Sequence, residues 1–119
     1  MTIGKNNRYV KSETIGLLFI EPQREASPVP LVDDATKRMT AALRSAQHGY
    51  RGIHTCRCGA QSDNVDHFIF NTDPRFTTNS LAVHYLAQHR DEVPPDELAN
   101  VLTLPAVHAE PTVHEITGR

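Results

Sequence analysis

The stretch HTCRCGAQSDN, residues 54–64, contains both cysteines of the chain, Cys56 and Cys58, with Gly59 directly behind them. A disulfide between thiols separated by one residue would close a very small, strained loop. In a reducing compartment, a close Cys pair is typical of a metal or redox site. Gly59 permits the positive φ that a tight turn around two thiolates often adopts. We therefore expect the two cysteines to form a knuckle that binds a metal ion.

A matching pair of histidines, His84 and His89, lies in a helix that the pattern SLAVHYLAQHRDEV predicts over residues 80–93. Five residues rotate a helix by about 500°, so the two rings start about 140° apart. They can converge if the last turn tightens toward a 3₁₀ form. Zinc binds thiolates and imidazoles in a tetrahedron, and four protein ligands leave no position for a substrate. The expected site is therefore one structural Zn²⁺ held by Cys56, Cys58, His84 and His89.

Other potential ligands lie near the knuckle. In an extended strand, His54 would point to the same face as Cys56 and Cys58, because side chains alternate between the two faces. His54 is therefore the alternative ligand, in place of one helix histidine. His67 is close enough in sequence to serve in the same way, together with its neighbours Asp63 and Asp66.

The segment FTTNSLAVHYLAQH, residues 76–89, resembles the second half of a two-Cys two-His zinc finger. That family carries an aromatic residue, a leucine ahead of the first histidine, and a second histidine roughly three to five residues later. Phe76, Leu81, His84 and His89 follow this order. The cysteines here are closer together than in the family, and the stretch between them and the histidines is about twice the usual length. The resemblance covers residues 54–90 and implies a zinc-binding module.

Size and composition limit what the fold can bury. The chain has 119 residues, a net charge of −2, 39% apolar residues and no tryptophan. Such a chain forms one domain, and its thin apolar supply would gain from a bound metal or a partner surface. The near-neutral charge gives no general attraction to phosphate backbones or anionic membranes. No apolar run approaches the roughly 20 residues that cross a bilayer. We expect a cytoplasmic or intracellular protein, or one within an assembled particle.

The expected fold is α+β: a small single domain with two or three helices and a short β-hairpin or knuckle stapled by one zinc, between extended polar termini. Residues 1–30 are predicted to form an extended N-terminal arm with one short strand. Residues 31–102 are predicted to form the zinc-stapled helical and β core. Residues 103–119 are predicted to form an extended C-terminal tail.

Within this outline, the apolar pattern places each element. The arm contains one buried strand over 14–22. An apolar stripe with Asp33 and Asp34 at its start predicts a helix over 33–47, ended by Gly49. A strand is expected over 50–60 and another over 68–70. Pro95 favours a short third helix that follows it, over 96–102.

Three classes of function fit these observations. The preferred one is a small zinc-binding structural or assembly module that docks on a protein partner, on copies of itself, or on a larger complex such as a phage particle. Long polar arms at both ends favour it, because they cannot bury enough surface to order themselves. We expect no enzymatic activity and no membrane association.

Two alternatives remain. One is a zinc-finger-like nucleic-acid-binding protein, in which the resemblance implies that Thr77, Asn79, Ser80 and Val83 face the bases. None of these is the Arg or Lys that most often contacts guanine, although Arg44, Arg51, Arg57 and Arg75 could form a patch around the knuckle. The other is a zinc-dependent hydrolase, and the chain contains no His-Glu-x-x-His signature to favour it.

Overall fold

A computed structural model describes residues 14–46, 52–70 and 75–119 of the chain. These residues form a mixed α+β domain, as expected. The strands are β1 (Thr14–Gly16), β2 (Leu43–Ser45), β3 (His67–Ile69) and β4 (Arg75–Thr78). The helices are α2 (Asp34–Ala42), α3 (Ala82–Gln88), the 3₁₀ turn η1 (Arg90–Glu92), α4 (Pro95–Val101) and α5 (Val113–Thr117). The predicted arm over 1–13 and the predicted helix stop at Gly49 lie outside the described residues.

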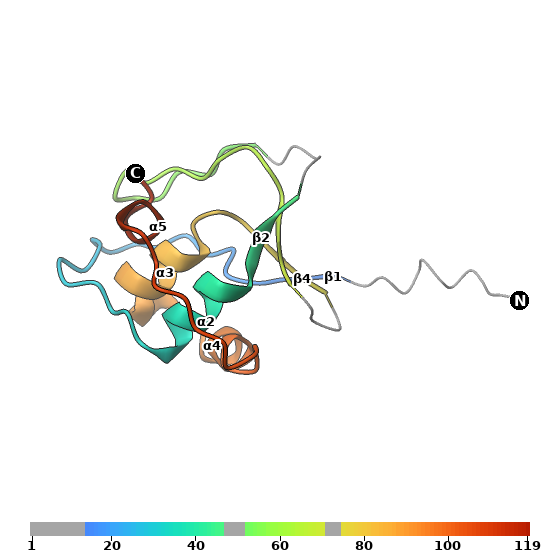
Figure 1. Ribbon diagram of the computed structural model, residues 1–119. Coiled ribbons are helices and arrows are strands. Elements are labelled where there is room, and N and C mark those ends of the chain that lie inside the picture. The colour runs from blue at the N-terminus through green and yellow to red at the C-terminus, as the bar shows by residue number, and fades with distance from the viewer. Residues whose placement is uncertain (1–13, 47–51, 71–74) are drawn as a thin grey trace, which may run out of the picture.

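The four strands form one sheet in the order β1-β4-β3-β2. β1 runs parallel to β4, and the other neighbours are antiparallel. Figure 1 shows the helices gathered on one side of this sheet. Along β3 and β4 the side chains alternate, with Ile69, Phe76 and Thr78 buried and Phe68 and Thr77 less so. The buried face therefore packs toward the helices, and the other face is turned away from them.

The centre of the core is α3. Every residue from Ala82 to Ala87 is buried, so this helix has no solvent-facing side over that length. It contacts α2 and α5 along the chain's helical layer. The core also contains Met39 of α2, Ile69 of β3 and Leu104, which follows α4. A fully surrounded helix is typical of the inside of a domain.

The first predicted helix is shorter than the pattern indicated. It begins where expected, since Asp33 caps it by accepting a hydrogen bond from the Thr36 amide at 3.3 Å. It ends at Ala42, however, and Leu43–Ser45 forms β2 instead of the helix continuing to residue 47. Pairing with β3 supplies backbone hydrogen bonds that replace those of a further helical turn, so tertiary contacts override the helical pattern here.

The N-terminal strand is also shorter than predicted. β1 ends at Gly16 rather than near residue 22, and Leu17 and Leu18 are fully buried beyond it. Leu18 has a φ of 62°, a left-handed conformation that interrupts the extended backbone of the strand. The Leu18 amide donates to the carboxylate of Glu97 in α4. This side chain supplies the hydrogen-bond acceptor that a neighbouring strand would otherwise provide.

The predicted strand over 50–60 is not formed in its described part. From residue 52 the chain makes a turn with one isolated bridge, Thr55–Gln61. β3 falls within one residue of the strand expected over 68–70, and α4 falls within one residue of the third helix expected over 96–102. β4 was not predicted: it lies between the strand expected over 68–70 and the helix expected to begin at residue 80.

The predicted extended tail over 103–119 contains a helix, α5. A capping box starts it, in which Thr112 and Glu115 exchange hydrogen bonds between side chain and backbone. Gly118 ends it in the left-handed conformation, with a φ of 71°. A Cβ at Gly118 would lie 2.6 Å from the Cβ of Ala60, so only glycine allows this close approach to the knuckle. α5 packs on α3, and this contact carries the C-terminal residues to the cysteine loop.

Candidate metal centre

The two cysteines lie on a tight knuckle that its own backbone holds in shape. The Cys56 amide donates to the Ala60 carbonyl at 2.7 Å, and the Gly59 amide donates to the Cys56 carbonyl at 2.9 Å. Gly59 has a φ of 96°, the conformation that made glycine the expected residue at this turn. One step out, the Ser62 amide donates to the His54 carbonyl at 2.8 Å. The result is the short hairpin-like knuckle that the cysteine spacing predicted.

The two histidines converge because α3 ends between them. His84 lies within the helix, whereas His89 is its C-cap, with a φ of −134° and a ψ of 35°. The His89 amide still donates to the Tyr85 carbonyl at 2.9 Å, and η1 follows directly. This departure from helical geometry, followed by a 3₁₀ turn, removes the angular separation that a continuous helix would impose. The rings of His84 and His89 lie with centroids 4.9 Å apart.

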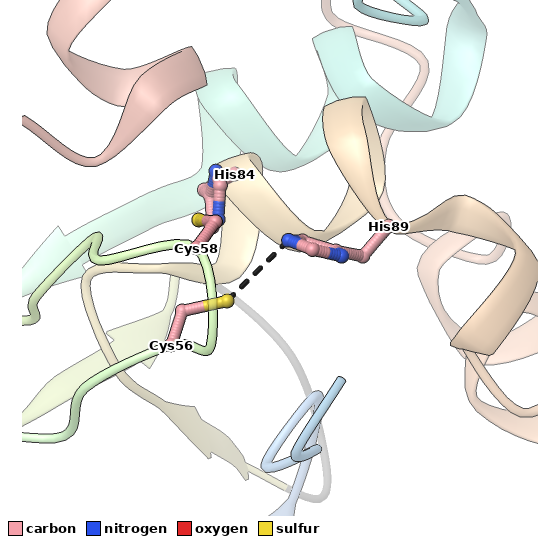
Figure 2. A group of neighbouring side chains, drawn as sticks. All are labelled: Cys56, Cys58, His84 and His89. Atoms are coloured by element: carbon pink, nitrogen blue, oxygen red, sulfur yellow. Dashed lines mark hydrogen bonds between the residues drawn. The ribbon is translucent and has the colours of Figure 1, made fainter. Parts of the chain in front are cut away.

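The structure brings all four predicted ligands together. Figure 2 shows the cysteines approaching from the knuckle and the histidines from α3. Cys56 Sγ lies 3.3 Å from His89 Nε2, and Cys58 Sγ lies 3.3 Å from His84 Nε2. All four ligand atoms lie within 4.8 Å of one another. A tetrahedral zinc site places sulfur and nitrogen ligands about 3.5 Å apart, so these residues form a cluster that can hold one metal ion.

The surrounding structure orients His84 for this role. Its Nδ1 lies 2.8 Å from the Ile116 carbonyl of α5, and a carbonyl can only accept, so Nδ1 carries the proton. Nε2 therefore keeps its lone pair and faces Cys58. Metal-binding histidines usually donate their second N–H to such an acceptor. His89 differs, because its buried Nδ1 has no hydrogen-bond partner within the described residues.

Burial favours the neutral forms of these groups when no metal is bound. His84 and His89 are 0% and 3% exposed, and burial lowers the pKa of both imidazoles. Burial also raises the pKa of the Cys56 thiol. Neutral imidazoles are ready to bind a metal ion, whereas a protonated thiol must release its proton first. Metal binding at this site is therefore coupled to proton release.

The alternative ligands lie elsewhere. His54 is not among the four clustered residues, because the knuckle curls instead of extending as the strand that would have aligned it with the thiols. His67 is buried on β3, where its ring approaches the Val65 carbonyl at 2.9 Å and the Asp63 carboxylate at 3.6 Å. The Asp63 side chain also accepts from the Val65 amide, as in a capped turn.

Two of the four residues that the zinc-finger resemblance placed against bases are buried. Asn79 and Val83 are 2% and 0% exposed. Asn79 accepts from the Leu81 amide at 2.8 Å, which orders the start of α3. A recognition helix must present one face to a groove, and α3 presents none. The burial of α3 therefore excludes base reading by this helix in the described fold.

The expected arginine patch does not gather at the knuckle either. Arg57 lies on the knuckle, but Arg44 and Arg75 belong to β2 and β4. Arg51 lies outside the described residues.

Sequence reasoning missed the contribution of the C-terminus to the centre. Besides the Ile116 carbonyl, the Arg119 guanidinium donates to the Cys58 carbonyl. The Gln61 amide donates to the Gly118 carbonyl at 3.4 Å. The capping residues from Thr112 to Gly118 are a sequence signal for a helix over this segment. They do not indicate which part of the fold the helix packs against.

Comparison with known proteins adds no further assignment. Among the described residues, no helix is long and apolar enough to cross a membrane. No protein-family model matches the chain, and neither the curated proteins nor the solved structures include one with significant similarity to it. The clustered Cys56, Cys58, His84 and His89 therefore stand as a candidate metal centre on their own geometry.

Proposed function

We propose that this protein is a small structural module whose fold is stapled by one zinc ion and whose surface docks on a protein partner or on further copies of the chain. The observation that carries the proposal is the buried group of two thiols and two imidazoles that joins the knuckle to the end of α3. Because the two thiols come from the knuckle and the two imidazoles from the end of α3, an ion held by all four would fix one segment against the other.

Zinc is the metal that this ligand set favours. Two thiolates with two imidazoles in a tetrahedral arrangement are characteristic of structural zinc sites. Magnesium and calcium prefer oxygen ligands, and the cluster contains none. The hydrogen bond from His84 to Ile116 supplies the outer support that such sites commonly have.

The role is proposed to be structural because four protein ligands fill a tetrahedron. Three of the four ligand residues are buried, and Cys58 is partly buried. A hydrolytic zinc site needs an open position and a nearby base. Asp63, a carboxylate close to the knuckle in sequence, accepts a hydrogen bond from the Val65 amide and lies near His67 rather than within the cluster.

Docking on a protein is supported by the apolar side chains on the surface. Nine large ones are at least 41% exposed among the described residues, including Val29 and Val113 at 75%. A small domain that leaves this much apolar surface in water gains from covering part of it. Whether the cover is another protein or another copy is answered by measuring the mass of the zinc-bound chain in solution by light scattering.

The decisive experiment is the metal content of purified protein, measured by elemental mass spectrometry for the parent, His84→Ala and His54→Ala. His54 is the matched control, since it lies on the same knuckle but outside the cluster. We expect one zinc per chain in the parent and in His54→Ala, and a loss of zinc in His84→Ala. A parent without metal would refute the zinc proposal. Loss of zinc in His54→Ala alone would move the site to the alternative ligand.

A further inference from the structure

One face of the sheet is turned away from the helices (Figure 1). Phe68 lies on this face because its two neighbours in β3 are buried on the other. Phe70 lies in the turn that follows β3, with its amide bonded to the Ala42 carbonyl beside β2, and it is 54% exposed. With Arg44 it borders a shallow pocket at the β2 edge of the sheet, next to Ala42 and Val107. Burying the Phe70 ring would stabilise the fold, yet about half of this residue is exposed to water, and Phe68 is partly exposed.

A third ring extends this surface toward β1. Gly16 pairs with Thr77, which lies on the same face as Phe68. A Cβ at Gly16 would lie 3.0 Å from the ring of Phe19, so that ring covers the outer side of β1. Phe19 is 44% exposed. Three of the chain's four phenylalanines therefore lie outside the core, with Phe19 and Phe68 on this face of the sheet and Phe70 at its β2 edge.

Two arginines from the neighbouring strands lie over these rings. The guanidinium carbon of Arg75, in β4, is 4.7 Å from the centre of the Phe68 ring. That of Arg44, in β2, is 4.9 Å from the centre of the Phe70 ring. Both distances are within the range of cation–π attraction. Within the described strands, Arg44 and Arg75 are the charged residues and none is acidic.

We infer that the outer face of this sheet binds single-stranded nucleic acid. Nucleobases stack on phenyl rings and on guanidinium planes, and phosphates accept hydrogen bonds from arginine. The face and its β2 edge offer both features. Phe68 and Phe70 supply the stacking surfaces. Arg75 supplies phosphate contacts, as do the N–H groups of Arg44 that do not donate to the Ala41 and Leu43 carbonyls. A duplex fits it poorly, because its base faces are already stacked. An acidic polypeptide would match the charge but would leave the planar stacks without a planar partner.

This surface is separate from the metal centre and from α3. The four ligands lie on the helix side of the sheet, so nucleic acid on the outer face would not contact the metal. The inference thus goes beyond the proposed function and can fail without affecting it. With two phosphate contacts, binding is expected to be weak, and its logarithmic salt dependence should have a slope of about −1.4.

The test is fluorescence anisotropy with the full zinc-bound chain at low salt. The probes are a fluorescein-labelled oligouridine of about 12 nucleotides and a duplex of the same length. We expect the single strand to bind at least about tenfold more tightly than the duplex. Phe70→Leu keeps an apolar side chain but removes the ring, and should weaken binding about fivefold or more. Phe70→Tyr should restore it, since tyrosine also stacks.

The arginines are tested by the salt slope. Arg44→Ala and Arg75→Ala should each reduce its magnitude by about 0.7. Arg24→Ala is the matched control, because Arg24 is exposed beside η1 and pairs with Asp91 at 3.7 Å, away from the sheet. Zinc content and thermal melting of every variant show that each one is folded.

Four results would overturn the inference: no binding of the single strand, equal binding of the duplex, an equal loss in Arg24→Ala, or competition by polyglutamate as effective as that by unlabelled oligouridine. The last result would identify the face as a docking surface for an acidic polypeptide. In each case the zinc content of the parent would remain an independent measure of the proposed function.

Discussion

Two irregular segments pack against the same central helix, and they are held in different ways. The knuckle around Cys56 and Cys58 is joined to α3 through the metal-binding group. The segment 17–31 is held instead by hydrogen bonds spread along its length. Glu92 accepts from the amides of Gln23 and Arg24, and Glu97 accepts from the amide of Leu18. The contact of the knuckle with α3 is thus concentrated in one group of four side chains, whereas segment 17–31 has several separate attachments.

The difference determines how each segment should respond to change. A structural zinc site concentrates much of a small domain's stability in one ion, because the ligands cannot assemble in the unfolded chain. A hydrogen bond to a charged group contributes about 1.5–3 kcal/mol at most. Removing one ligand should therefore affect the whole fold, whereas removing one acceptor should loosen one part of a segment. The following changes test this contrast, beginning with the largest expected effect.

Cys58→Ser should lower the free energy of unfolding by several kcal/mol, because serine is a poor zinc ligand and the knuckle would lose its attachment to α3. Thermal or chemical denaturation in the presence of zinc measures the effect. With a chelator present, the parent and the variant should unfold alike, since both then lack the ion. If Cys58→Ser unfolds like the parent while zinc is present, the structural role of the metal is wrong.

Ending the chain after Pro111 should weaken zinc binding about 10–100-fold, as is typical when the acceptor behind a ligating histidine is lost. The truncated chain lacks the Ile116 carbonyl that orients His84. A competition titration with a chromogenic chelator measures the affinity. Val113→Ser is the matched control, since Val113 is 75% exposed on the same helix. Equal affinities for all three proteins would show that α5 does not support the site.

The four residues of the candidate metal centre could be predicted from the sequence. The contacts that α5 makes with this centre and the hydrogen bonds that hold segment 17–31 could not. Thiols and imidazoles are few in this chain, and their spacing restricts the geometry, so four residues separated by as many as 33 positions could be grouped. Glu97 and Leu18 are 79 residues apart, and a glutamate in a helix carries no sign of which amide it will reach. The partners of metal-binding side chains can therefore be predicted from the sequence. The partners of common hydrogen-bonding groups can be predicted only within a local motif.

The α+β class of the fold was predicted correctly. The ends of its helices and strands depend on strand pairing, which no local sequence pattern reveals. The apolar stripe of α2 continues past Ala42, yet Leu43 pairs with Ile69 in the sheet. Conversely, α5 was missed although its capping box and terminal glycine are local signals, because a polar segment with prolines was interpreted as a tail. Such short elements are stabilised by tertiary packing, so sequence periodicity alone identifies them poorly.

Glu97→Ala should lower the free energy of unfolding by about 1–3 kcal/mol, because the buried Leu18 loses the acceptor for its amide. The zinc content should stay at the parental value, since Glu97 is not part of the cluster. Hydrogen exchange should increase mainly in segment 17–31. Glu110→Ala is the matched control: Glu110 forms an exposed ion pair with Lys37, and its loss should change stability by less than about 1 kcal/mol. A loss of zinc in Glu97→Ala would contradict the independence of the two attachments.

The smallest expected effect is a pH-dependent change in stability from Asp33, which caps α2 just after segment 17–31 and pairs with Arg90. Hydrogen bonding to Arg90 lowers the pKa of Asp33 from 3.8 to about 2. Because the folded-state pKa is the lower one, the stabilisation is present above the unfolded value and is lost as the pH falls from about 4 to about 2. The Asp33 side chain is 40% exposed, so solvent screening limits the effect to about 1 kcal/mol or less.

Asp33→Asn keeps a side chain that can cap α2 but removes the charge. In the metal-free chain, the variant should therefore be less stable than the parent at neutral pH and equally stable at the acid end of this range, as measured by urea denaturation. A stability difference that does not change with pH would mean that Asp33 acts only as a helix cap.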